Sequence, residues 1–223
     1  ALNDFYRTSR FNDFFNTHTD IYELGLQVFN DSVMAHFDQE WYTRFYGTPP
    51  AEQFRIIIGF TNGPCNYGPS RKLTGQPKEV FAIMNYAVDD NERPIFYKKV
   101  VETVVHEFCH SFTKIKGDTE KALEKSGKAL QEYTYFSMRR QAYSTWRNIL
   151  EESLVRAATI CYLIDHDYDE KDIRNAIIEQ VDRNFFWMPE LVQTLRYYES
   201  HRKKYPTFTS FYPEIIRFFD RYV

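Results

Sequence analysis

The sequence lacks the features that mark several specialised classes of protein. Its three cysteines, Cys65, Cys109 and Cys161, form no CxxC pair, which excludes a fully paired disulfide framework and a cysteine zinc finger. No run of about 18 apolar residues is present, so we expect no membrane-spanning helix. The 28 Lys and Arg residues are scattered among 31 Asp and Glu residues, for a formal net charge of -3, and this balance argues against a nucleic-acid partner.

Internal repeats, low-complexity tracts and Gly/Ser linkers are absent from the sequence as well. The only stretch rich in both glycine and proline runs from Thr61 to Lys78, and its composition predicts a series of turns. At 223 residues the chain is long enough for one substantial core and short for two. We therefore expect a single domain over residues 1–223.

The chain changes its hydrophobic period partway along. Runs rich in β-branched and apolar residues at Phe54–Phe60 and Glu79–Asn85 predict two strands. Apolar residues at helical spacing predict helices over residues 20–37, 96–116, 118–140, 141–165, 170–182 and 186–202, and a last helix through Pro213–Phe219. The expected fold class is α+β, with a small antiparallel or mixed N-terminal sheet followed by a mostly helical half.

The pentapeptide HEFCH, on the first helix expected after the sheet, is the strongest chemical signal. Residues four apart lie on one face of a helix, so His106 and His110 can present imidazole nitrogens to one metal ion. Glu107 would lie beside that ion, where its carboxylate can accept a proton from the attacking water. The surrounding residues are mostly apolar, and a charged pair of histidines would be costly there. The pattern predicts a zinc site.

The segment Thr103–Phe112 resembles the extended signature of zincin metallopeptidases. The continuation typical of the metzincin branch is absent, because Thr113 and Lys116 stand where Gly and a third His would be needed. Further along, two acids lie in an apolar helix, and Leu150–Leu154 is similar to the second zinc helix of the gluzincin branch. Glu152 stands at the position of the zinc ligand in that comparison.

The resemblance to gluzincins implies a zincin-like fold, a Zn2+ cofactor and a set of site residues. His106, His110 and Glu152 would be the metal ligands, and Glu107 would be the catalytic base. Three protein ligands suit a catalytic zinc ion, because one coordination position is left for water.

Two other residues compete with Glu152 for the third ligand position. Arg156 follows Glu152 by four residues and Arg147 precedes Glu151 by four, so both acids have a basic partner on the helix. The Glu-to-Arg order favours Glu152 over Glu151. His166 is the third candidate, although it lies in a polar, acidic stretch where histidines are usually exposed.

The sequence gives fewer indications of how a substrate would bind. Tyr67 on the Gly/Pro-rich stretch and Tyr86 after the second strand are candidates to stabilise an oxyanion. In zincins the strand before the active helix commonly lies at an edge and pairs with an extended peptide, and Phe81–Asn85 is similar in position. This resemblance implies that the strand aligns the substrate through its backbone.

The function expected from these features is that of a zinc metallopeptidase acting on a peptide or protein. One alternative is a zincin-like scaffold that binds peptide or carbohydrate without catalysis, which would have no use for Glu107. Another is a zinc hydrolase that acts on a non-peptide bond. The sequence begins at Ala1 without an initiating Met, so a signal segment could have been removed, and a secreted or periplasmic location is expected.

Overall fold

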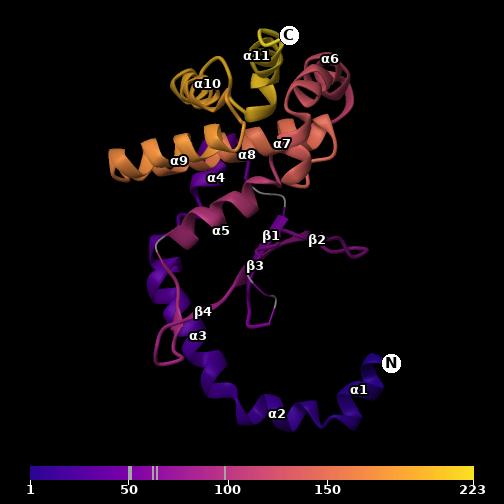
Figure 1. The fold of residues 1–223 in the computed structure, drawn as a ribbon, viewed down its shortest axis with the longest axis vertical. Coiled ribbons are helices and arrows are strands. Elements are labelled where there is room, and N and C mark those ends of the chain that lie inside the picture. The colour runs from indigo at the N-terminus through magenta and orange to yellow at the C-terminus, as the bar shows by residue number, and fades with distance from the viewer. Residues whose placement is uncertain (50–51, 62, 64, 98) are drawn as a thin grey trace.

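The computed structural model describes residues 1–49, 52–61, 63, 65–97 and 99–223. The fold is α+β as expected, with a small sheet in the N-terminal half and a helical C-terminal half (Figure 1). The described strands are β1 (Glu52–Gly59), β2 (Ser70–Arg71), β3 (Lys78–Asn85), β4 (Ala87–Val88) and β5 (Pro94–Ile95). The described helices are α1 (Leu2–Thr8), α2 (Phe11–Thr17), α3 (Thr19–Ser32), the 3-10 turn Met34–His36, α4 (Trp41–Tyr46), α5 (Lys99–Cys109), α6 (Gly117–Tyr133), α7 (Tyr135–Arg140), α8 (Trp146–Asp165), α9 (Glu170–Asp182), α10 (Met188–Ser200) and α11 (Phe208–Asp220).

Strand β3 lies at the centre of the main sheet. It pairs in parallel with β1 on one side and in antiparallel fashion with the short β2 on the other. Tyr67 extends the second pairing, because its N–H and C=O both hydrogen-bond to Ile83. The expectation that Phe81–Asn85 forms an edge open to substrate is therefore wrong. The segment from Tyr67 to Arg71 occupies that edge, within a stretch whose composition predicted only turns.

Helix α5 packs on β3 on one side and on α8 on the other, so it lies between the sheet and the helical half (Figure 1). Helix α8 also contacts α6, α9 and α10. Because neighbours cover it on several sides, its apolar residues extend around most of the helix. Glu151 and Glu152 are nevertheless buried in the middle of α8, and a buried carboxylate is costly unless it has partners.

The structure divides some of the predicted helices and adds others. The helix expected over 118–140 is interrupted at Thr134 between α6 and α7, and the helix expected over 96–116 is the shorter α5. The predicted range 170–182 coincides with α9. Helices α1, α2 and α4 were not predicted. No helix in the described part of the chain is long and apolar enough to cross a membrane.

Candidate metal centre

The first two candidate ligands meet at the C-terminal end of α5. The helix ends at Cys109, so His106 lies in its last turn and His110 is the first residue beyond it. The amide of Phe112 donates to the carbonyl of Cys109 at 3.0 Å, which extends the turn past the helix end. The two imidazole centroids are consequently 5.0 Å apart, with the ring planes at 84°. The spacing of four residues thus brings the two imidazoles close together, as predicted.

Glu152 on α8 reaches both histidines. Its Oε1 lies 3.4 Å from Nε2 of His106, and its Oε2 lies 3.6 Å from Nε2 of His110. One potential ligand atom from each of the three residues can be chosen so that all lie within 4.8 Å of one another. Tetrahedral zinc with bonds of about 2.0–2.2 Å separates neighbouring ligand atoms by roughly 3.3–3.6 Å. The three residues therefore could hold a metal ion of that size.

The protonation of these groups also suits a cation. Burial lowers the pKa of His106 to about 4 and lowers the pKa of His110, so both imidazoles are neutral at pH 7 and can act as ligands. Burial opposes ionisation of Glu152, but attraction to His106 and Arg156 outweighs it and lowers the pKa of Glu152. The site is two neutral nitrogen donors and one carboxylate, the donor set that catalytic zinc commonly uses.

Arg156 holds Glu152, the third candidate ligand, in position. Its Nη2 lies 2.7 Å from Oε1 of Glu152 and donates to the hydroxyl of Tyr143 at 3.0 Å. Its Nη1 donates to the side chain of Gln180 on α9, and the ring centroid of Phe185 lies 5.1 Å from its Cζ. The Tyr143 hydroxyl lies near the Glu152 carboxylate and contributes to its lowered pKa. These contacts restrict the orientation of the carboxylate, as supporting residues around metal ligands do.

Glu107 lies close to this group without belonging to it. Burial, reinforced by the negative charge of Glu152, raises the pKa of Glu107 to about 7. The segment that forms the sheet edge passes directly over its carboxylate. A Cβ atom built on Gly68 would come within 2.3 Å of Oε2 of Glu107, so any side chain at this position would require the Glu107 carboxylate to move.

A pocket of about 690 Å³ opens onto the candidate metal centre. Its lining includes His106 and Glu107 from α5, Arg156 from α8, Gln180 from α9, Tyr143 from the segment before α8, and Asn66 from the segment before β2. Sequence reasoning missed Tyr143, because nothing in its local pattern indicates that it would approach the site.

The two tyrosines nominated from the sequence do not line this pocket. Tyr67 is 49% exposed on the sheet edge, and Tyr86 packs its ring 4.8 Å from that of Phe60. Of the three tyrosines considered, Tyr143 alone shares the pocket with Glu107.

The alternative third ligands are engaged elsewhere. Oε1 of Glu151 accepts a hydrogen bond from the amide of Ile115 at 2.9 Å, and its Oε2 lies 3.1 Å from Nζ of Lys114. His166 follows the far end of α8, where its Nε2 lies 3.2 Å from Oδ2 of Asp38. The structure brings only Glu152, of the three candidates, to His106 and His110.

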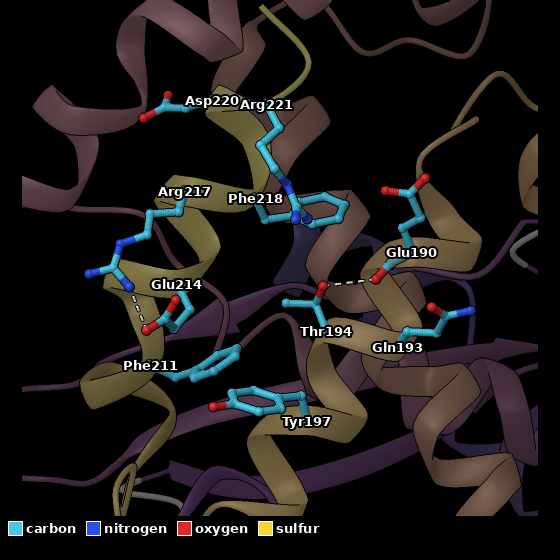
Figure 2. A pocket seen from close by; sticks show the side chains of 10 residues that line it. All are labelled: Glu190, Gln193, Thr194, Tyr197, Phe211, Glu214, Arg217, Phe218, Asp220 and Arg221. Carbon is cyan, nitrogen blue, oxygen red and sulfur yellow. Dashed lines mark hydrogen bonds and ion pairs between the residues drawn. The ribbon is translucent and has the colours of Figure 1, made fainter.

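A second hollow, of about 940 Å³, lies between α10 and α11 (Figure 2). Phe211 and Tyr197 form its apolar part, and Arg217 pairs with Glu214 on its wall. Its lining residues include no histidine or cysteine and mix charges of both signs. The smaller pocket is therefore the better candidate for catalysis, because its lining joins one potential metal ligand, His106, to Glu107, a carboxylate with a raised pKa.

Comparison with known proteins places the chain in a family without assigning an activity. A family described as "Domain of unknown function (DUF4932)" matches residues 1–218. No curated protein and no solved structure shows significant similarity to the chain.

Proposed function

The chain belongs to the DUF4932 family, and we propose that it is a zinc-dependent hydrolase of the gluzincin type that cleaves peptide bonds. One observation carries the proposal: His106, His110 and Glu152 converge within metal-binding distance. Glu107 lines the pocket of about 690 Å³ that His106 also lines. A zinc ion bound there would polarise the carbonyl under attack and lower the pKa of a coordinated water to about 7. The remaining chemistry falls to side chains of this chain.

Glu107 is the proposed general base. Its carboxylate would take a proton from the attacking water and pass it to the nitrogen of the leaving amine. A base is most effective when its pKa lies near the working pH, and burial brings the pKa of Glu107 to about 7. The pocket also shelters this carboxylate from bulk water, so its charge acts over a short distance with little screening.

Tyr143 is the proposed donor to the oxyanion that forms during attack. Its hydroxyl is within reach of Glu152 and Arg156, and burial raises its pKa, so it keeps its proton at neutral pH. A positioned hydroxyl can donate to an oxygen that gains charge in the transition state. Tyr143 thereby replaces Tyr67 and Tyr86 in this role.

The substrate is proposed to be an extended peptide. Because Tyr67 to Arg71 forms the edge beside β3, an incoming strand would align on this segment rather than on β3 itself. Gly68 lies against Glu107, so a peptide on that edge would pass close to the base. Secretion or export to the periplasm stays a prediction from the sequence.

The proposal is tested by measuring metal content and hydrolysis on the same samples. Purified protein should carry about one zinc ion per chain by elemental mass spectrometry, and it should cleave members of a mixed peptide library. Glu107→Ala should retain the zinc and lose turnover by at least about 1,000-fold. Glu199→Ala, which removes a glutamate of α10 near the last residue of α8, is the matched control.

Two outcomes would contradict the proposal in different ways. Protein that takes up no zinc after reconstitution would show that the three residues are not a metal site. Protein that binds zinc and peptides, but whose peptide affinity and lack of turnover are the same in wild type and Glu107→Ala, would be a binding protein on the same scaffold.

A further inference from the structure

Helices α1 and α2 form an arm, residues 2–17, that extends away from the rest of the molecule (Figure 1). None of the arm's side chains is buried in the described structure. Its large apolar side chains are exposed by 39% or more: Leu2, Phe5, Tyr6, Phe11, Phe14 and Phe15. Helices of seven residues are not stable alone in water, so this arm needs a surface to pack against.

The apolar face of the arm continues a stripe that begins in the core. Phe29 of α3 is buried, and Tyr22, two turns earlier, packs edge-on against Phe60 at 5.1 Å. Across the junction of α2 and α3, Phe15 stacks on Tyr22 with ring centroids 4.9 Å apart. This stacking links the arm to α3 at the junction. The apolar side chains of the arm beyond Phe15 remain exposed.

A surface of matching chemistry exists on the same chain. The α3–β1 groove, about 260 Å³ in volume, is lined by apolar side chains that include Leu26, Met34, Phe37, Phe54 and Ile56. It begins on α3, the helix that carries the arm. The unpaired edge of β1, within the described sheet, lies beside it.

The charges of the two surfaces also match. On the arm, Arg7 pairs with Asp4 at 3.1 Å and Arg10 pairs with Asp13 at 2.7 Å, so the side-chain charges cancel locally. None of the groove's lining residues in the described part of the chain is charged. A neutral apolar arm and a neutral apolar groove suit each other better than either suits an anionic lipid surface or a nucleic acid.

We propose that the arm of one copy of this chain packs in the α3–β1 groove of a second copy, and that the second copy returns the same contact. Such an exchange uses the same two patches on both chains, so it closes into a twofold dimer and leaves no open end. This inference is independent of the candidate metal centre, which lies on the other side of α5 among α8 and α9.

Sedimentation of the purified chain over a range of concentrations provides the test. The wild type should form a dimer. The double variant Phe5→Asp/Phe14→Asp places charges on the exposed apolar face and should weaken dimerisation by at least about 100-fold. Asn3→Asp/Asn12→Asp adds the same charges to polar positions of the same helices and should change it by less than about threefold.

The groove is tested from its rim. Leu26 is 54% exposed, so Leu26→Asp should weaken dimerisation without disturbing the fold, whereas Gln27→Asp on the same helix should not. A mixture of the arm variant and Leu26→Asp should form a one-to-one dimer, because one intact arm and one intact groove remain. Circular dichroism of each variant confirms that it folds.

Three results would overturn the inference. A wild type that stays monomeric at the highest concentration would mean that the arm folds back or binds something else. A dimer that survives Phe5→Asp/Phe14→Asp would use another surface. Variants that each lose dimerisation but do not associate when mixed would indicate pairing of arm with arm.

Discussion

Buried carboxylates near the two ends of α8 have different kinds of partner. In its first half, Glu152 meets Arg156 and two neutral imidazoles. At its last residue, Asp165 accepts hydrogen bonds from Arg196 and from the indole of Trp41 at 2.8 Å. The second cluster contains one more acid, Glu199, whose pKa is raised to about 8 by burial and by its hydrogen bond to Asp165.

The two clusters differ in whether their own residues satisfy all of their buried polar groups. At the far end, the proton that Glu199 holds at neutral pH and the Arg196 charge satisfy both carboxyl groups. At the near end, one arginine faces one carboxylate, and two imidazole nitrogens point at the same place as that carboxylate. Buried charge with an arginine is therefore common to both clusters, whereas a set of unprotonated donors converging on one point is found only at the near end.

Substitution of one glutamate in each cluster gives the largest expected contrast. Glu152→Gln removes an anionic ligand and should lower zinc affinity by at least about 100-fold. Glu199→Gln should leave zinc affinity unchanged. Competition with a chromophoric chelator measures both. Equal loss of zinc in the two variants would mean that general destabilisation, and no specific ligand, explains the effect.

Tyr143 tests whether the near end also performs chemistry. Tyr143→Phe removes one hydroxyl and should lower kcat by about 100-fold through loss of the oxyanion donor. Zinc affinity should fall by less than about tenfold, because the ligands remain. Steady-state kinetics on a cleaved peptide, with zinc titration alongside, separates the two effects. A change in zinc affinity with unaltered kcat would assign Tyr143 to positioning Glu152 alone.

Substitution of Arg156 should affect zinc affinity, whereas substitution of Arg196 should not. Arg156→Gln should lower zinc affinity by about 10- to 100-fold, because Glu152 loses the group that orients it. Arg196→Gln should lower stability but leave zinc affinity intact. Isothermal titration with zinc and urea unfolding of both variants provide the readouts. Zinc binding that is unchanged in Arg156→Gln would show that Tyr143 suffices to hold the ligand.

The smallest expected effect is the pH dependence of the free energy of unfolding that Glu199 causes at the far end of α8. Glu199 has a pKa raised to about 8 in the folded protein and an ordinary pKa of 4.5 when unfolded, so the folded state holds the extra proton between these values. Its contribution to the free energy of unfolding is therefore present below pH 4.5 and is lost as the pH rises towards 8. Glu199→Gln should be more stable than the wild type at pH 9 by on the order of 1 kcal/mol, with little gain at pH 4.

Urea unfolding at the two pH values measures this difference. An equal gain at both would contradict the assignment, because a neutral side chain should help only where the carboxyl group ionises.

The grouping of the three candidate metal ligands could be predicted because their signals are local. The spacing of His106 and His110 defines one face of a turn, and the order of Glu152 and Arg156 distinguishes that acid from Glu151. The fold class was predictable for the same reason, since the hydrophobic period changes between β3 and α5. Both predictions depend on residues within a few positions of one another.

The features missed depend on contacts between distant segments. Tyr143 lies at the site through its contacts with Arg156 and Phe185, which are distant in the sequence, and no local pattern near Tyr143 indicates those contacts. The central position of β3 depends on β2, which is two residues long and lies in a stretch rich in turn-forming residues. Helix α4 is short, and its Trp41 and Tyr46 are buried by tertiary contacts that no local pattern reveals.

Gly68 carries a consequence for the variation expected among members of this family. The smallest side chain that can be added at this position, a single methyl group, would displace the carboxylate of Glu107 without touching the three candidate metal ligands. Under the proposed function, a substitution on the sheet edge would therefore lower turnover and leave zinc binding unchanged. The residue that aligns with Gly68 should then distinguish family members that share the proposed activity from members that share only the scaffold.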